Sequence, residues 1–265
     1  MDVEFAHLSD PGKQREHNQD YLGHVVPASP ARARSHGWLF VLADGVGGSE
    51  KGEVASQAAV EHLTAGFREA SAFEGLSALL MRLAQEANVR IYEAGRSHSP
   101  GGASMATTLV ASAFRYDRVV VAHAGDSRCY LIRGGQARSL TSDHTVAQEQ
   151  ARIGLLTAKE ASEAPTRHVL SRSLGNDLFV NIETNDIQVY PGDVLLQCCD
   201  GLYHSVESSE MAAVAGADGD LSVAARRLVD IANDRDGSDN ISVQLIRVRS
   251  VERVGLYRGR PYKLR

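Results

Sequence analysis

The stretch LADGVGGSEKGEVAS, residues 42–56, ends an apolar segment on a carboxylate, Asp44, and continues with glycines and a helix-like pattern. A carboxylate at the end of a buried strand lies at the rim of a sheet, where its backbone is fixed and its side chain can face a cleft. Glycines at 45, 47 and 48 allow backbone carbonyls to approach a metal ion and a substrate to approach the backbone. The stretch therefore predicts a binding site at the rim of a sheet.

Aspartates at the ends of apolar runs recur along the chain. Asp126 follows RVVVAHAG, Asp200 follows DVLLQCC, Asp239 precedes NISVQLIRV, and Asp20 stands where a further strand should begin. Each one alone is explained by turn chemistry, because Asp-Gly and Asp-Ser are common in turns. All five together favour one site, since like charges gathered at a rim need cations to neutralise them. Oxygen ligands select Mg²⁺ or Mn²⁺ over Zn²⁺, and two such ions would hold a water between them.

The composition is that of an ordinary globular protein: 265 residues, 43% hydrophobic and 23% charged, with a net charge of -5. Such a chain is not built to coat nucleic acid, and no apolar run reaches the roughly 20 residues that cross a bilayer. The first residues carry acids and lack the apolar stretch of a signal peptide. The three cysteines form no CxxC pair and predict neither disulfides nor a zinc site. We therefore expect a cytoplasmic protein.

Strand-like segments outnumber helical ones. Runs rich in Val, Leu and Ile predict strands, and they include WLFVLAD, TTLVASAF, RVVVAHAGD, RCYLIRGG, DVLLQCCD and NISVQLIRV. The segment RCYLIRGGQARSL predicts a hairpin in which Gly134 and Gly135 supply the positive φ of a tight turn. Residues 27–36 predict an exposed connection between two strands. Because hairpins dominate, the order of elements predicts antiparallel sheets covered by helices.

Helical periodicity marks three further segments. Apolar residues over 76–91 recur at helical spacing and predict one buried stripe. Val54, Ala58 and Phe67 predict a similar stripe on the helix after the glycines, and LSVAARRLVDIANDR predicts a third helix. Neither an internal repeat nor a linker divides the chain.

Taken in order, the motifs resemble those of the protein phosphatase 2C family, the metal-dependent PPM-type Ser/Thr phosphatases, and in particular its compact bacterial members. The match runs through SDPGKQREHNQD, ADGVGG, GEVAS, MATTLVA, AHAGDSRCYLIRGG, LTSDHT, SRSLG, GDVLLQCCDGL and SDNISV, and covers nearly the whole chain. The ordered set is far more specific than any single motif. The resemblance implies an α+β fold, a four-layer α-β-β-α sandwich of two antiparallel sheets flanked by helices. It implies a catalytic domain over 1–250 with a flap at about 142–175, and a basic extension over 251–265.

The same resemblance assigns the ligands of two core ions. Asp44 would bridge the two ions, and Gly45 would lend its backbone carbonyl to one of them. Asp200 and Asp239 would complete the shell of the first ion. Asp20 would serve the second ion, directly or through water.

The resemblance also implies that Asp126, with Asp200, holds a third and weaker ion. Arg15 would bind the phosphate, because its planar guanidinium suits two phosphate oxygens. The catalytic residues would then be Arg15, Asp44 and Asp200, with Mn²⁺ or Mg²⁺ as cofactor. The implied reaction is hydrolysis of phosphoserine and phosphothreonine in proteins by direct attack of a metal-bridging water. A Ser/Thr protein kinase is the expected counterpart, nucleic acid and membranes are not expected partners, and a monomer is expected.

The sequence departs from the family pattern near the Asp-Gly motif. Family members often carry a histidine just after this motif or past the second glycine pair, where it can protonate the leaving alkoxide. Here Val46 and Ser49 occupy those positions. His17, His62 and His144 lie in or near the motifs and are candidate replacements, although a lone histidine is more often structural.

Two alternatives stay open at this point. A catalytically weak or silent phosphoprotein-binding module of the same fold is favoured only by the missing histidine, because all five carboxylates are present. Another two-metal hydrolase, such as a phosphodiesterase, would mix His with Asp, and these motifs show no HxD-type cluster. The basic tail RVRSVERVGLYRGRPYKLR is expected to be a last strand and a solvated or packed extension, rather than a docking segment.

Overall fold

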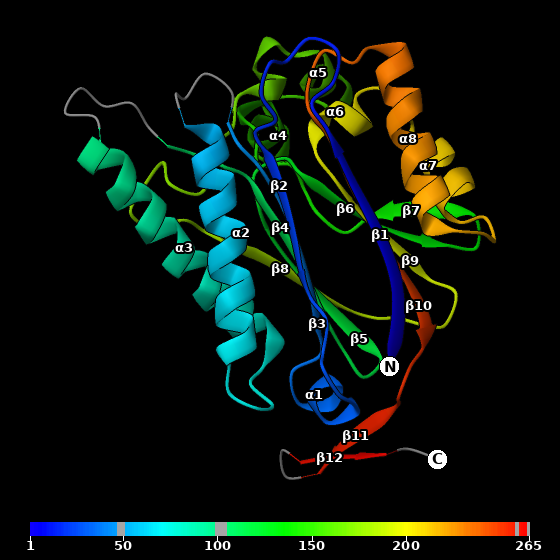
Figure 1. Cartoon of the computed structure of the whole chain (residues 1–265). Coiled ribbons are helices and arrows are strands. Elements are labelled where there is room, and N and C mark those ends of the chain that lie inside the picture. The colour runs from blue at the N-terminus through cyan, green and yellow to red at the C-terminus, as the bar shows by residue number, and fades with distance from the viewer. Residues whose placement is uncertain (47–50, 99–104, 258–259, 264–265) are drawn as a thin grey trace.

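Two five-stranded antiparallel sheets form the centre of the structure (Figure 1). The computed structural model describes residues 1–46, 51–98, 105–257 and 260–263. In spatial order, the first sheet contains β1 (Asp2–Asp10), β10 (Ile241–Ser250), β9 (Val194–Cys198), β6 (Arg128–Arg133) and β7 (Gln136–Ser139). The second sheet contains β2 (Asp20–Val25), β3 (Trp38–Asp44), β4 (Leu109–Arg115), β5 (Arg118–Ala124) and β8 (Glu183–Gln188).

Helices cover the outer face of each sheet (Figure 1). The second sheet is covered by α2 (Gly52–Glu69) and α3 (Leu76–His98). The first sheet is covered by α6 (Asp200–Tyr203), α7 (Ser208–Ala215) and α8 (Leu221–Arg235). The predicted α+β fold, a four-layer α-β-β-α sandwich, is confirmed.

Strand β3 is buried on both faces, which explains why WLFVLAD reads as a continuous apolar run. Successive side chains of a strand point to opposite faces of the sheet. Leu39 and Val41 therefore pack toward α2 and α3. Phe40 and Leu42 face the first sheet and meet residues such as Leu195 in the layer between the sheets. The strand that ends on Asp44 is thus fixed from both sides.

The buried stripe of α2 differs from the predicted one. Phe67 is buried as expected, together with Leu63, Ala59 and Ala55, which precede it at four-residue intervals. Val54 is 45% exposed, so its assignment to the stripe was wrong. A helix turns about 100° per residue, which places Val54 about 140° around the helix from Phe67. Ala58 is only half-buried. The stripe predicted for α3 over residues 76–91 is confirmed.

The predicted connections are present. Gly134 and Gly135 join β6 to β7 with φ of 59° and 75°, the left-handed conformation that the tight turn requires. The exposed segment 27–36 connects β2 to β3 and includes a short helix, α1 (Pro30–Ser35). Ser29 caps this helix by accepting a hydrogen bond from the backbone N–H of Arg32, an arrangement that the Ser-Pro pair favours.

The C-terminal segment leaves the sandwich after β10. Strands β11 (Val254–Tyr257) and β12 (Arg260–Lys263) pair with each other in a separate two-stranded sheet (Figure 1). The predicted extension over 251–265 thus contains a hairpin. Among the described residues, no helix combines the length and the apolar character needed to cross a membrane.

Candidate metal centre

The five predicted carboxylates gather at one end of the sandwich, where strands of both sheets begin or end. Asp44 ends β3 and Asp20 begins β2, and the two are directly opposite each other in the antiparallel pair. Asp126 follows β5 by two residues. Asp200 comes just after β9, and Asp239 just before β10, in the other sheet. The negative charges of the other four all act on the carboxyl of Asp44, so the five lie close together.

This gathering makes full ionisation costly. Burial, followed by repulsion from the other four aspartates, raises the pKa of Asp44 well above its usual range. Burial and then the charge of Asp126 raise the pKa of Asp200 to about 8. Burial raises the pKa of Asp20 to about 6 and, with Asp143, that of Asp126 to about 6. Because each charge disfavours its neighbours, the cluster holds five anions only when cations neutralise them.

The residues present fit hard divalent cations. Both carboxylate oxygens of Asp20 are buried without a well-formed hydrogen bond. Ser242, Cys199 and Asp44 are near enough to lower the pKa of Asp20, but burial outweighs them. The Sγ of Cys199 lies within 4.8 Å of a carboxylate oxygen of both Asp20 and Asp44. Burial raises the pKa of this thiol well above its usual range, which disfavours the thiolate form that binds metal ions. Oxygen donors alone favour Mg²⁺ or Mn²⁺.

The backbone around Asp44 is held by hydrogen bonds from two threonines that precede β4. Thr107 donates through Oγ1, and Thr108 through its backbone N–H, to the carbonyl oxygen of Asp44, both at 2.8 Å. The Oγ1 of Thr108 accepts the N–H of Asp44 at 2.9 Å. These bonds explain why regular pairing in the predicted strand TTLVASAF begins only at Leu109.

Gly45 occupies a space with no room for a side chain. A Cβ there would lie 2.4 Å from the carbonyl carbon and oxygen of Gly52 and 2.8 Å from the carbonyl oxygen of Gln19. Its N–H donates to that same Gln19 oxygen at 3.0 Å. Two backbone segments of this chain therefore crowd Gly45, whereas the approach of a metal ion or a substrate stays a prediction, and Gly47 and Gly48 lie outside the described residues.

Asn240 fixes the loop between β1 and β2, a role that sequence analysis missed. Its side chain is almost fully buried and accepts the N–H of Gln19 at 2.8 Å. Its Nδ2 donates to the carbonyl oxygens of Pro11 and His17, each at 3.0 Å. The residue therefore ties the segment that carries Arg15 and Asp20 to the start of β10.

Arg15 lies at the edge of the carboxylate cluster. Its Nη2 donates to Oδ2 of Asp239 at 2.9 Å, and the two side chains are 44% and 37% exposed. The other carboxylate oxygen of Asp239 accepts the N–H of Asn240 at 2.8 Å. The arginine that was predicted to bind phosphate is thus beside the cluster and open to solvent.

The candidate histidines lie in different surroundings. His62 pairs with Glu86 at 3.1 Å, between α2 and α3. His144 accepts the N–H of Gly125 at 3.2 Å and stacks on His123 with ring centroids 4.7 Å apart, and burial lowers its pKa to about 4. Both are engaged in structural contacts. His17 is exposed in the same loop as Arg15, and Ser49 lies outside the described residues.

The predicted flap, residues 142–175, contains α4 (Val146–Arg152), α5 (Ala158–Glu163) and the 3₁₀ helix η1 (Pro165–His168). In Figure 1, α4 and α5 lie at the same end of the sandwich as α6. Arg172 anchors the segment: its Nη2 contacts Glu149 at 2.7 Å and its Nη1 contacts Glu183 in β8 at 2.8 Å. This segment is therefore tied to the second sheet through β8.

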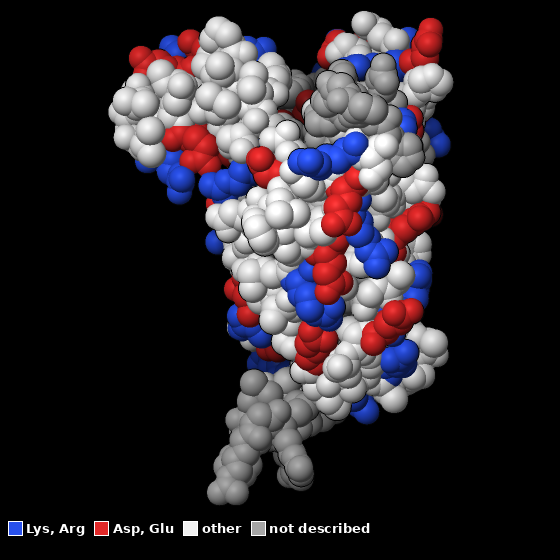
Figure 2. All heavy atoms as spheres, turned by 90° about the vertical axis from the view of Figure 1, so that its left-hand side faces the viewer, with Lys and Arg blue, Asp and Glu red and all other residues white. Residues whose placement is uncertain are grey.

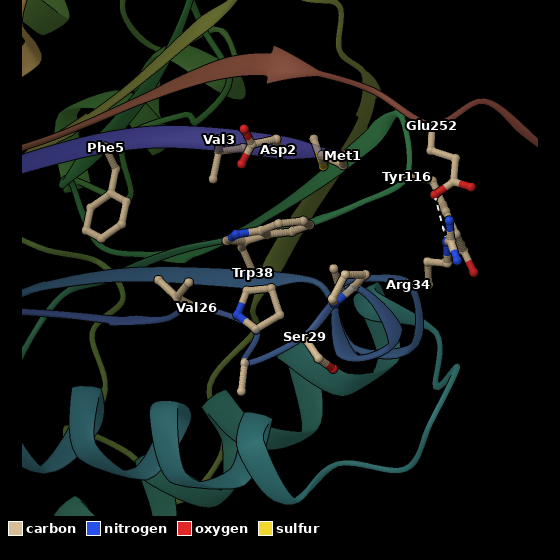
Figure 3. A pocket seen from close by; sticks show the side chains of 14 residues that line it. Met1, Asp2, Val3, Phe5, Val26, Ser29, Arg34, Trp38, Tyr116 and Glu252 are labelled. Carbon is tan, nitrogen blue, oxygen red and sulfur yellow. Dashed lines mark hydrogen bonds and ion pairs between the residues drawn. The ribbon is translucent and has the colours of Figure 1, made fainter.

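A large surface pocket lies elsewhere (Figure 3). Its volume is about 490 Å³, and its lining includes Trp38, Phe5, Arg34 and Glu252, the last two joined by an ion pair of 3.0 Å. Trp38 begins β3 and Asp44 ends it, so at about 3.3 Å per residue the pocket is about 20 Å from the cluster. None of the predicted site residues lines it.

The outer face of α2 and α3 carries intermixed charge. Figure 2 shows Lys and Arg alternating with Asp and Glu over this face. Ion pairs of α3 include those of Arg82 with Glu74 and Glu86, each at 3.1 Å. A continuous basic stripe of the kind that binds nucleic acid is not present on the described part of this face.

Two antiparallel sheets whose common end gathers mutually repelling carboxylates provide a set of oxygen ligands that suits divalent cations. The family model described as protein phosphatase 2C matches residues 12–241. The chain belongs to the protein phosphatase 2C family.

Individual relatives agree with this membership. The protein phosphatase PhpP of Streptococcus pneumoniae serotype 2 is 32% identical over 246 residues, which cover 92% of this chain and 97% of PhpP. The serine/threonine phosphatase of S. agalactiae superposes with a TM-score of 0.84 at 31% identity, covering 93% of this chain and all of that one. The catalytic domain of the phosphatase PstP, solved with two manganese ions, has a TM-score of 0.76 at 29% identity, covering 94% and 99% of the two chains.

Proposed function

We propose that this chain is a divalent-metal-dependent protein phosphatase that hydrolyses phosphoserine and phosphothreonine. The observation that carries the proposal is the cluster of five aspartates from two sheets around Asp44, with Arg15 at its edge. Membership of the protein phosphatase 2C family supports the reaction. The two manganese ions in the related PstP domain support two core ions. Phosphorylated proteins are the proposed substrates, and a Ser/Thr kinase supplies the opposing reaction.

The proposed ligands are those that the sequence resemblance implies. Asp44 would be a ligand of both ions, Gly45 would contribute its backbone carbonyl, Asp200 and Asp239 would hold one ion, and Asp20 would hold the other. When bound, such ions lower the pKa of a water and neutralise charge on the phosphoryl group. Mn²⁺ and Mg²⁺ both suit the oxygen donors, and a third, weaker ion at Asp126 and Asp200 belongs to the same proposal.

The protein's own groups position the phosphate ester. Arg15 presents a planar guanidinium that can hold two phosphate oxygens, and Asp239 orients it by the 2.9 Å ion pair. The hydrogen bonds of Asn240 hold the backbone of the loop that carries this arginine. The N–H of Val46 donates to the carbonyl oxygen of Ala106 at 3.0 Å, which fixes the backbone after Gly45. The valine side chain has no proton to donate to the leaving alkoxide.

The proposal is tested with a phosphothreonine peptide and Mn²⁺. Wild type, Asp44→Asn and the control Asp230→Asn, an exposed aspartate on α8, are compared with and without a chelator. Loss of a group that merely supports a metal ligand costs roughly 10–100-fold. We therefore expect kcat/KM of Asp44→Asn to fall by roughly 100-fold or more, and Asp230→Asn to match wild type. Equal turnover by wild type and Asp44→Asn would refute the assignment.

A further inference from the structure

Two histidines lie beside Asp200 and have no part in the proposed hydrolysis. His204 follows α6, and its Nδ1 is 3.9 Å from Oδ2 of Asp200. His168 is the last residue of η1 in the flap, and its ring centroid is 5.0 Å from that of His204, with the planes at 83°. One ligand atom from each of the three residues lies within 4.8 Å of the other two.

The three side chains meet because two separate segments converge. Asp200 begins α6, and His204 is four residues later, so both point from the same face of one helical turn. His168 comes from the flap, where the bridge between Thr145 and Leu170 holds the backbone next to η1. The group therefore spans the junction between the flap and the first sheet.

The donor set differs from that of the core cluster. Two imidazoles and one carboxylate suit Zn²⁺, whereas the core offers only oxygen. Zinc-ligand bonds of about 2.0–2.1 Å in a tetrahedron place donor atoms about 3.4 Å apart. The 3.9 Å between Nδ1 of His204 and Oδ2 of Asp200 exceeds that spacing by about 0.5 Å, and one ligand atom from each of the three residues lies within 4.8 Å of the other two.

The surroundings permit a cation to enter. His168 is exposed, and the side chains of His204 and Asp200 are 40% and 25% exposed. Two guanidinium groups are near His204, those of Arg128 and Arg167. Arg128 is paired: Asp143 accepts two of its hydrogen bonds, at 2.9 and 2.6 Å, and the hydroxyl of Tyr130 accepts a third at 3.0 Å.

We propose that His168, His204 and Asp200 form a zinc site that joins the flap to the catalytic domain. Three protein ligands leave a fourth position for water. The regulatory consequence rests on the proposed phosphatase function. Zinc shares Asp200 with the core cluster and fixes η1, so Mn²⁺-dependent turnover falls while zinc is bound.

Zinc binding is measured directly by calorimetry on the full-length protein after a chelator has been used and removed, so that no other cation competes for Asp200. Wild type is compared with His168→Ala, His204→Ala and the control His62→Ala, which removes a histidine between α2 and α3. We expect wild type and His62→Ala to bind one zinc ion that each of the other variants binds at least roughly 10-fold more weakly. Zinc should also shift the imidazole nitrogen resonances of His168 and His204 in wild type. Identical zinc isotherms for all four proteins would overturn the site.

Inhibition is scored separately, relative to the Mn²⁺-dependent activity of each protein. Zinc should inhibit wild type at concentrations that spare His168→Ala, and equal inhibition of both would overturn the regulatory role. The calorimetric result needs no phosphate ester. If every protein failed to hydrolyse phosphopeptides, the phosphatase proposal would fall, whereas the isotherms would still decide the zinc site.

Discussion

Replacing Asp126 with asparagine should stabilise the metal-free protein at neutral pH and leave it unchanged in acid. Burial and the charge of Asp143 raise the pKa of Asp126 from 3.8 to about 6 in the folded protein. The folded state therefore favours the protonated carboxyl. Below pH 4 the carboxyl of Asp126 is protonated in the folded and unfolded states, and the free energy of unfolding has its full value. As the pH rises through about 6, ionisation of Asp126 lowers the free energy of unfolding. Asparagine has a similar shape and never ionises, so the variant escapes that loss.

The size of the effect follows from the same pKa. One pKa unit corresponds to about 1.4 kcal/mol, so a rise from 3.8 to about 6 amounts to about 3 kcal/mol above neutrality. For 265 residues the unfolding entropy is about 0.6 kcal/mol per kelvin. The variant should then melt about 5 °C higher than wild type at pH 7.5, and at the same temperature near pH 4.

Thermal unfolding followed by circular dichroism, with a chelator present, measures this difference. Asp230→Asn, an exposed aspartate on α8, controls for a general loss of negative charge. Saturating Mg²⁺ should reduce the advantage of Asp126→Asn, because cations relieve the same repulsion in wild type. A gain of equal size at both pH values, or a variant less stable than wild type at pH 7.5, would refute the reasoning.

Three further substitutions test how the site is built. Gly45→Ala should destabilise the protein by about 1–3 kcal/mol in urea unfolding and impair metal binding, because the new Cβ would clash with the Gly52 carbonyl. Wild-type stability of this variant would contradict the close backbone approach. Arg15→Lys should lower kcat/KM roughly 10–100-fold with an unchanged melting temperature, because the loss of one charged hydrogen bond to phosphate costs about 1.5–3 kcal/mol. Unchanged kinetics would exclude phosphate binding by Arg15. Asn240→Ala should lower the free energy of unfolding by about 3 kcal/mol in denaturant, because it leaves the N–H of Gln19 and the carbonyls of Pro11 and His17 without their partner. Wild-type stability would show that water replaces these hydrogen bonds.

The carboxylates were predictable because strand ends leave a strong local signal. An apolar run that stops on Asp44 or Asp200 marks the rim of a sheet in any fold of this kind. Hairpin spacing likewise predicts antiparallel sheets, and the glycine pair before β7 predicts its turn. The phase of α2 was not as well defined, because alanines and valines occur around much of the helix. Val54 was placed in the buried stripe for that reason, and the structure exposes it.

Other features depend on tertiary contacts that leave no local pattern. Asn240 acts through backbone groups more than 200 residues away. The hydroxyl of Thr108 accepts a hydrogen bond from the backbone N–H of Asp44 and so helps to fix the position of that carboxylate. The four-residue spacing of Asp200 and His204 could have been noticed in the sequence, but the approach of His168 depends on the fold of the flap.

The division of the carboxylates between two sheets has a mechanical consequence. Asp20 and Asp44 belong to one sheet, and Asp200 and Asp239 flank strands of the other. Cations bound by all four would therefore crosslink the two sheets. Inside the sandwich, Gln197 of one layer donates to Ser112 of the other at 2.6 Å. By thermodynamic linkage, loosening that internal contact must weaken cation affinity by the same factor by which cations tighten the contact. The affinity for a divalent cation would therefore report how tightly the two sheets pack against each other.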